Sequence, residues 1–294
     1  MPSYRVLQVD VFTTTPLKGN PLAVLPDARG LDAATMQAIA REMNLSETAF
    51  VFPSTDAAAD YRVRFFTPAA ELPFAGHPTI GTAHALLETG VLVRPGETPF
   101  TLQQETAAGT LPIEVEGEGA DRWFTMTQPT PVFRPTPPLA ELAQALRVSE
   151  RDIAGEPATV AVGVAWVVVP LRSLEVVRGL APDLDAIARM DGVAGVTVFS
   201  PEAEDPGCRV RVRSFAPREG IVEDPVCGSG NGCVGAYLAT TGMLGPPPLR
   251  YVAEQGVEIG RDGRVRVSVE GVDGALRVRV GGQAVTVLDG TLRL

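Results

Sequence analysis

The chain has 294 residues, of which 45% are hydrophobic, and a formal net charge of -10 at pH 7. This length and composition can bury a large core, so they exclude a disordered protein and indicate two domains or one large one. The acidic balance argues against nucleic acid or an anionic membrane as a partner. Three cysteines and two histidines supply neither a disulfide framework nor the ligands of a structural zinc, and we expect no metal.

The N-terminal part of the sequence shows no basic segment followed by an apolar one, which predicts a cytoplasmic protein without a secretory signal. The longest apolar run, Val160 to Val169, is too short to span a bilayer. We interpret it as a single buried strand and expect no membrane partner.

In the first third of the chain, alternation predicts strands over Val6 to Phe12 and Tyr61 to Thr67. Helical spacing predicts a helix over Leu31 to Met43 that begins after Asp32 and ends at Asn44. Shortly afterwards, Glu47 stands at the start of an apolar strand. A carboxylate at this place either points to solvent or lines a cleft.

The segment Glu223 to Cys233 combines two adjacent acids, a proline, a thiol, a hydroxyl, an amide and three glycines directly before a helical pattern. Glycine lets the backbone approach a ligand closely, and the first N-H groups of a helix attract an anion. The segment therefore predicts a cradle for a carboxylate or a phosphate, with Gly228 and Gly230 close to the ligand.

A related segment, Phe74 to Gly90, lies earlier in the chain. At a shift of 152 positions Pro73, directly before it, meets Pro225, Gly76 meets Gly228, and the end of the following helix is repeated up to Gly90 and Gly242. The strands in front, Arg62 to Pro68 and Arg211 to Pro217, match at a shift of 149. Strand, acidic loop, glycine turn and helix thus occur twice in the same order, which indicates an internal duplication.

The duplication predicts an α+β protein of two similar halves, with two helix N-termini facing each other across a cleft. We place the first half at residues 1-128 and the second at 129-281, with Pro129 to Pro138 as the candidate linker. Residues 282-294 could return to the first half, which the sequence leaves open. Further alternating strands and one more helix are predicted at Phe100 to Gln104, Leu111 to Val115, Trp123 to Thr127, Leu139 to Leu146 (the helix), Arg264 to Val269 and Leu276 to Val280.

Four segments carry a resemblance to a known family: Asp10 to Leu25, Asn44 to Phe50, Glu71 to Gly81 and Glu223 to Gly232. They resemble the signature segments of the PhzF family, the phenazine-biosynthesis-type isomerases, which share the diaminopimelate epimerase fold. The resemblance implies two pseudo-symmetric domains, each a mostly antiparallel sheet curled around a central helix. It also implies an active site between the domains, no metal or organic cofactor, and a homodimer.

The resemblance implies roles for individual residues. Glu47, as the acid/base group, would remove a proton from one carbon of a small carboxylate-bearing metabolite, and a proton would be returned elsewhere in its conjugated system. The other catalytic residues implied are His77, Asp224 and Ser229, and the substrate-binding residues are Asn20, Gly76, Cys227, Gly228 and Gly230. Enclosure in a cleft would raise the pKa of a carboxylate and let it act first as base and then as acid.

One departure from the related epimerases and racemases is visible. Their two cysteine thiols, one from each domain, match Ala75 and Cys227 here, so only one thiol is present. A thiol at a helix N-terminus is expected to have a lowered pKa. An epimerase or racemase that uses Glu47 and Cys227 therefore stays as an alternative, as does a non-catalytic binding protein that retains the fold.

Arg209, Arg211 and Arg213 alternate along one predicted strand and so share one face. We expect a solvated face, from which one guanidinium could turn to steer an acidic substrate into a negatively charged protein.

Overall fold

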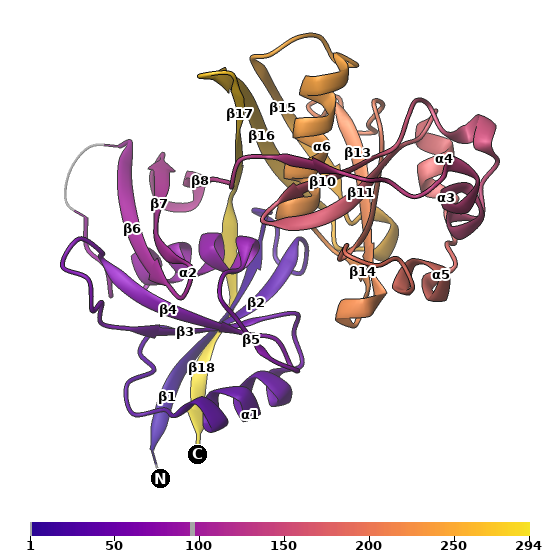
Figure 1. The fold of residues 1–294 in the computed structure, drawn as a ribbon. Coiled ribbons are helices and arrows are strands. Elements are labelled where there is room, and N and C mark those ends of the chain that lie inside the picture. Colours follow the sequence, from indigo (N-terminus) through magenta and orange to yellow (C-terminus); the bar gives the residue numbers. More distant parts are fainter. Residues whose placement is uncertain (1, 95–97) are drawn as a thin grey trace. The chain divides into compact units, whose positions relative to one another are not determined.

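The structure is a computed structural model that describes residues 2-94 and 98-294. The chain forms two compact units, one of Met1–Met126 with Gly281–Leu294 and the other of Thr127–Val280. Each unit combines a mostly antiparallel sheet with one long buried helix, α2 (Gly76–Glu88) in the first and α6 (Gly228–Thr241) in the second (Figure 1). The predicted α+β class is confirmed.

The first unit starts with β1, and the closing strand of the chain returns to it. Its strands are β1 (Ser3–Val11), β2 (Asn20–Leu25), β3 (Thr48–Phe52), β4 (Tyr61–Phe66), β5 (Glu71–Leu72), β6 (Phe100–Thr106), β7 (Gly109–Glu116), β8 (Trp123–Thr127, ending in the second unit) and β18 (Ala284–Arg293). Its helices are α1 (Ala33–Met43), α2 and the 3-10 turn η1 (Gly119–Asp121). The predicted caps of α1 are confirmed, because Asp32 Oδ1 accepts from the N-H of Thr35 at 2.8 Å and Asn44 closes the helix at φ 51°.

The second unit holds the remaining elements. Its strands are β9 (Val132–Arg134), β10 (Ala158–Val162), β11 (Val164–Pro170), β12 (Gly195–Ser200), β13 (Val210–Ala216), β14 (Ile221–Asp224), β15 (Leu249–Gln255), β16 (Gly263–Val272) and β17 (Ala275–Gly282, ending in the first unit). Its helices are α3 (Leu139–Leu146), α4 (Leu174–Arg178), α5 (Leu184–Ala188), α6 and the 3-10 turns η2 (Glu150–Asp152), η3 (Pro217–Glu219) and η4 (Val257–Ile259). The helix predicted over residues 139-146 is confirmed.

The two units repeat one strand order. In the first, β2 runs parallel to β3, β3 antiparallel to β4, and β4 parallel to β6. In the second, β11 runs parallel to β12, β12 antiparallel to β13, and β13 parallel to β15. The central helix follows the short strand β5 in one unit and β14 in the other. The predicted internal duplication is confirmed in topology.

An ion pair is duplicated as well. Arg64 bonds both carboxylate oxygens of Glu71, at 2.6 and 2.7 Å, and Arg213 bonds both oxygens of Glu223, each at 2.8 Å. Each guanidinium also lies over the phenylalanine two residues further on, at 5.3 and 5.1 Å from the ring centre. These acids therefore bind the short strand to its neighbour in both units.

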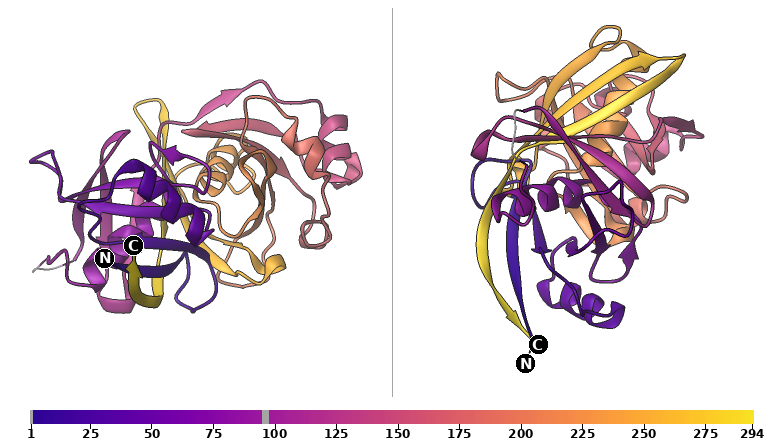
Figure 2. Two further views of the ribbon diagram at one scale, coloured as in Figure 1. Left: turned by 90° about the horizontal axis from the view of Figure 1, so that it is seen from below. Right: turned by 90° about the vertical axis from the view of Figure 1, so that its left-hand side faces the viewer.

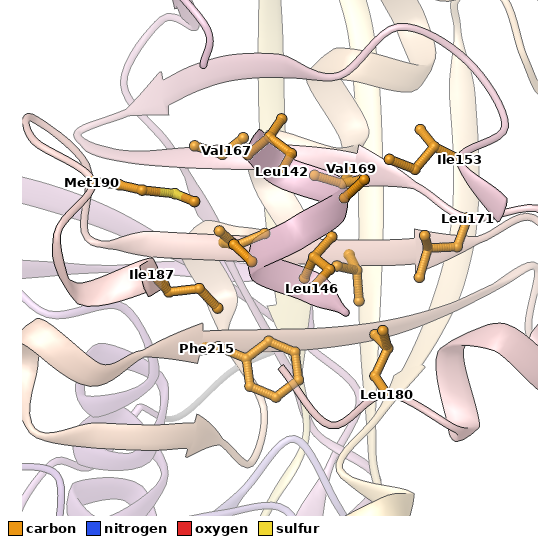
Figure 3. Close-up of a cluster of buried hydrophobic side chains, with 14 of the residues drawn as sticks. Leu142, Leu146, Ile153, Val167, Val169, Leu171, Leu180, Ile187, Met190 and Phe215 are labelled. Atoms are coloured by element: carbon orange, nitrogen blue, oxygen red, sulfur yellow. The ribbon is translucent and has the colours of Figure 1, made fainter. Parts of the chain in front are cut away.

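Each unit has a second apolar cluster besides the one around its central helix. In the first, Met36 and Ile39 of α1 pack against Phe50 and Phe66. In the second, Leu142 and Leu146 of α3 point toward side chains of β11 and toward Phe215 of β13 (Figure 3). The central helices α2 and α6 are buried on most of their surface, which explains why they are apolar on nearly all sides.

The interpretation of Val160 to Val169 as one strand is wrong. Gly163, at φ +93°, makes a tight turn there, and the two arms pair antiparallel as β10 and β11. A glycine tolerates this backbone conformation without the strain that a side chain would add. The candidate linker Pro129 to Pro138 also contains regular structure, since β9 pairs with β10 through Val132 and Ala161. Prolines flank this strand rather than interrupt it, as expected at a sheet edge.

The expectation of a solvated arginine face holds for Arg209 alone. Arg211 is 0% exposed and ion-paired with Glu254, and Arg213 is buried against Glu223. Alternation shows which side chains share a face, but it does not show whether acids from other strands cover that face.

The two ends of the chain lie together in the first unit. β18 runs antiparallel to β1 from Ser3 opposite Arg293, and the N-H of Leu294 donates to the carbonyl of Pro2 at 3.1 Å. Figure 2 shows the same proximity of the termini from two further directions. Among residues 2-94 and 98-294, every helix is too short or too polar to cross a membrane.

Candidate active site

The first cluster of predicted site residues lies at the N-terminus of α2. Glu47 comes from the segment between α1 and β3, and its Oε2 lies 3.5 Å from Nε2 of His77, the second residue of α2. The two side chains are only 14% and 8% exposed. Both side chains have therefore lost most of their hydration.

A second contact fixes the tautomer of His77. The ring bonds the backbone of Pro21, which has no N-H and must accept through its carbonyl oxygen. Nε2 has no hydrogen-bond partner among the described residues, so the donor to Pro21 is Nδ1-H. Nε2 then faces a carboxylate oxygen that is also an acceptor. The two acceptors can form a hydrogen bond only when a proton lies between them.

Burial lowers the pKa of His77 below its ordinary value, and the nearby charge of Glu47 offsets this only in part. The imidazole therefore favours its neutral form at pH 7, in which Nε2 can accept a proton.

Asn20 is buried at the start of β2, close to the segment that carries Glu47. Its Oδ1 accepts from the hydroxyl of Ser46 at 3.5 Å, and the carbonyl of Glu47 accepts from the N-H of Ala23, also at 3.5 Å. These contacts hold the Glu47 segment against β2. Contact of Asn20 with a substrate stays a prediction.

The second cluster lies at the N-terminus of α6. Cys227 is the N-cap, and its Sγ accepts from the N-H of Gly230 at 3.2 Å. The hydroxyl of Ser229 lies 3.5 Å from this Sγ and accepts from Nε1-H of Trp166 at 2.9 Å. A thiol, a hydroxyl and an indole N-H thus meet at one helix end.

Amide side chains fix the loop in front of α6. Gln255 Oε1 accepts from the N-H of Cys227 at 3.2 Å and from Nδ2 of Asn231 at 2.8 Å. Its Nε2 donates to the carbonyl of Asp224 at 2.9 Å, and an oxygen of the Asp224 carboxylate accepts from the N-H of Val226 at 3.1 Å. The backbone at this helix end is therefore preorganised.

The predicted ligand-binding glycines differ in surroundings. A Cβ built on Gly76 meets nothing within 4 Å, so this backbone is open to a ligand. A Cβ on Gly230 would lie 2.9 Å from Ser214 Oγ and 3.1 Å from Cys227 Sγ, and the N-H of Gly230 already donates to that sulfur. Gly230 is therefore needed for packing of the helix end, and contact of Gly228, the first residue of α6, with a ligand stays a prediction.

The expectation of a lowered pKa for Cys227 is wrong. Burial raises the pKa of this thiol well above its usual value, and the charge of Asp224 raises it further. The hydrogen bonds from Ser229 and Gly230 act in the opposite direction but do not compensate. At its helix N-terminus the sulfur is enclosed, and loss of hydration outweighs the helix dipole.

The structure thus groups the predicted residues into two sets, each within one unit. Asn20, Glu47, Gly76 and His77 form the set of the first unit. Asp224, Cys227, Gly228, Ser229 and Gly230 form the set of the second unit. The sequence prediction missed the parts of Pro21, Trp166 and Gln255. Pro21 acts through its backbone carbonyl, which any residue has, and Trp166 and Gln255 come from strands distant in the chain. Of the three, only Trp166 stands out in the sequence, as an aromatic hydrogen-bond donor in an apolar run.

Comparisons with known proteins identify the class. Among the relatives that match nearly the whole chain, the trans-2,3-dihydro-3-hydroxyanthranilate isomerase of Pseudomonas fluorescens is 38% identical, with 97% of this chain and 98% of the relative covered. Antisense-enhancing sequence 1 of Schizosaccharomyces pombe is 36% identical, with 99% of each covered. The protein is an isomerase by these relationships. Residues 9-290 match the PhzC-PhzF family, described as phenazine biosynthesis-like protein, and the chain belongs to that family.

Solved structures agree with this assignment. A PhzF-family phenazine biosynthesis protein of Bacillus anthracis superposes with a TM-score of 0.91 at 31% identity, with 100% of both chains covered. A hydroxyproline epimerase of Agrobacterium vitis superposes with a TM-score of 0.66 at 18% identity, with 99% of this chain and 91% of that chain covered. The second likeness concerns the fold alone.

Proposed function

We propose that the protein catalyses a cofactor-independent isomerisation in which Glu47 moves a proton between two carbons of a small carboxylate-bearing substrate. The observation that carries this proposal is the enclosed pair of Glu47 Oε2 and His77 Nε2, 3.5 Å apart. Neither atom has a hydrogen-bond partner among the described residues, and the two can bond each other only through a proton.

The reaction balances without a further reagent. The Glu47 carboxylate takes a proton from a C-H bond, and the electron pair of that bond spreads into the double bonds and the carboxylate of the substrate. The protonated Glu47 carboxyl exchanges its proton with solvent and then delivers a proton to another carbon of the conjugated system. Glu47 ends as it began, and the substrate keeps its formula. General acid-base catalysis of this kind contributes about a hundred- to ten-thousand-fold to the rate.

In this proposal His77 stabilises the protonated form of Glu47. Its neutral Nε2 accepts a hydrogen bond from the protonated carboxyl, and the Pro21 contact keeps Nε2 in the acceptor form.

We also propose that the second cluster binds a carboxylate, the group that we expect the substrate to carry. The first N-H groups of α6 have no intrahelical partner, and the helix dipole favours an anion there. Ser229 adds a hydroxyl donor, and the amide network around Gln255 keeps the loop in place.

The relative from Pseudomonas fluorescens suggests the first compound to test, trans-2,3-dihydro-3-hydroxyanthranilate. We expect the wild type to convert it in deuterated water with incorporation of deuterium at carbon, followed by NMR. Glu47→Gln keeps the shape but cannot carry the proton, so incorporation should fall at least about a hundredfold. Glu42→Gln, an exposed change on α1, is the matched control and should leave the rate unchanged. Incorporation that persists in Glu47→Gln would refute the role of Glu47.

A second candidate is an epimerase that uses Glu47 and Cys227. It is favoured by a relative from Pseudomonas aeruginosa described as a predicted epimerase, 32% identical with a TM-score of 0.82 and 99% of both chains covered. Against it stand the raised pKa of Cys227 and the alanine at position 75. This candidate requires inversion of an amino-acid stereocentre, detectable by chiral chromatography, and its loss in Cys227→Ala.

A homodimer, a cytoplasmic location and a place in a biosynthetic pathway are implied by the family resemblance and stay predictions. Light scattering after size-exclusion chromatography would test the first of these directly.

A further inference from the structure

The duplication allows the two helix ends to be compared residue by residue. Ala23 of β2 pairs with Thr48, and Val168 of β11 pairs with Thr197. The two threonines are 149 positions apart, the shift that relates the two units in this region. A residue a given number of positions before Ala23 therefore has the same place in the first unit as the residue that number of positions before Val168 has in the second.

Two steps before these residues lie Pro21 in the first unit and Trp166 in the second. The neighbouring strands run in the same sense, because β1 pairs antiparallel with β2 through Pro21 and β10 pairs antiparallel with β11 through Trp166. Pro21 and Trp166 therefore occupy the same place in the two units.

Both positions contact the same place on the central helix. Pro21 accepts from His77 through its carbonyl, and Trp166 donates to Ser229 through Nε1-H. His77 and Ser229 are equivalent at the shift of 152, each being the second residue of its helix. In both units, the residue at this strand position therefore fixes the polar side chain at the N-terminus of the central helix. It does so with an accepting carbonyl in the first unit and a donating indole N-H in the second.

The chemistry of the second contact decides where the Ser229 proton goes. An indole N-H can only donate, so Ser229 Oγ must be the acceptor in the bond with Trp166. The hydroxyl proton is then left for another acceptor. Within the second unit its near neighbour is Cys227 Sγ at 3.5 Å, and a thiol sulfur is a weak acceptor. An anionic oxygen of a ligand would be a much better one.

We propose that Trp166 is a positioning residue that orients the Ser229 hydroxyl as a donor to the substrate carboxylate. This inference rests on the proposed function, in which the second cluster binds that carboxylate. Trp166 is 3% exposed, so water does not compete for its N-H, and its bond to Oγ restricts the rotation of the hydroxyl before the substrate arrives. Such preorganisation favours binding because the donor need not be turned when the ligand binds.

The first experiment observes the contact directly. In protein labelled with 15N in its two indoles, Trp123→Phe identifies the signal of Trp166. We expect Ser229→Ala to shift this N-H signal upfield and to accelerate its exchange with water, whereas Tyr237→Phe, which removes a hydroxyl further along α6, leaves it in place. A Trp166 signal that does not respond to Ser229→Ala would overturn the inference whatever the activity.

The second experiment separates positioning from structure. Trp166→Phe removes the N-H and keeps an aromatic ring, and we expect it to raise KM about three- to tenfold with little change in kcat. In the Ser229→Ala background the same substitution should change KM by less than about twofold, because the hydroxyl that it orients is gone. Equal effects of Trp166→Phe in both backgrounds would overturn the inference, since they would show a general packing defect.

Failure of the proposed function gives a different result. If the wild type neither converts trans-2,3-dihydro-3-hydroxyanthranilate nor incorporates deuterium from solvent into it, the isomerisation of this compound is refuted. Positioning is then judged by titration with anthranilate: Trp166→Phe should weaken binding about three- to tenfold in the native background and not in Ser229→Ala. Equal weakening in both backgrounds would overturn it.

Discussion

The guanidinium of Arg211 lies 2.8 Å from the carboxylate of Glu254, and the two side chains are 0% and 1% exposed. Arg211 also bonds Glu204 and Glu258, each at 3.1 Å. Three acids thus surround one buried cation inside the second unit. The equivalent residue of the first unit, Arg62, is partly exposed.

Because Arg211 is buried and Arg62 is partly exposed, the same substitution at the two positions gives a test and its control. Arg211→Met leaves the buried carboxylate of Glu254 without its cation, so we expect a loss of about 3 to 5 kcal/mol in the free energy of unfolding. Arg62→Met should cost less than about 1 kcal/mol because water solvates its surroundings. Urea unfolding monitored by circular dichroism measures both, and equal losses would contradict the distinction.

The pH dependence of stability should follow the two histidines. Burial lowers the pKa of both His77 and His84 below the ordinary value of 6.5. As pH falls below 6.5, the unfolded chain therefore binds protons that the folded chain does not. The stability that neutral imidazoles contribute is fully present above this pH and is lost as pH falls toward the folded pKa values.

The measurement is the unfolding free energy between about pH 7.5 and 5.5. His77→Gln and His84→Gln should each flatten its slope, and the double variant should flatten it further, since the chain has no other histidine. A slope that both single variants leave unchanged would show that the imidazoles titrate normally in the folded protein.

The three cysteines should be unreactive in the native protein. All three are buried, and burial raises the pKa of Cys208 to about 11, that of Cys233 to about 12 and that of Cys227 well above its usual value. Because the thiolate is the reacting form, we expect iodoacetamide at about pH 7.5 to label the native chain slowly and all thiols rapidly in urea.

Mass spectrometry of the labelled peptides would locate any fast thiol. Rapid labelling of Cys227 in native protein, abolished in Cys227→Ser, would contradict the raised pKa and would revive the epimerase candidate.

Gly195, at the start of β12, should not tolerate a side chain. A Cβ there would lie 1.9 Å from the carbonyl oxygen of Phe215, which belongs to the neighbouring strand. We expect Gly195→Ala to cost about 3 kcal/mol of unfolding free energy, at the upper end of overpacking effects. Gly271→Ala in β16 is the control, because its Cβ meets nothing within 4 Å. A thermal shift as small as that of the control would contradict the steric clash.

The sequence predicted elements whose signals are local. Asp32 and Asn44 mark the two ends of α1 because each acts on backbone groups within one turn of itself. The duplication was visible for the same reason, since strand, loop and helix recur in one order at nearly constant spacing. The turn at Gly163 was missed because both arms are buried and apolar, so hydrophobicity continues across it.

The contacts around the candidate site could not be predicted in the same way. Glu47 and His77 meet, as do Trp166 and Ser229, although each pair is separated by a strand or more in the chain. The raised pKa of Cys227 depends on enclosure by such distant neighbours, whereas the helix end that suggested a lowered pKa is local. Residue types and their neighbours in sequence therefore identified the two helix N-termini. They did not identify the partners that set the protonation of the side chains at those N-termini.

The pairing of β18 with β1 has a consequence for biosynthesis. During translation, β1 leaves the ribosome first, yet its partner strand emerges only after every residue of the second unit. The second unit can therefore fold while the first still exposes an unpaired strand edge, and nascent chains in this interval would be the ones most in need of chaperones.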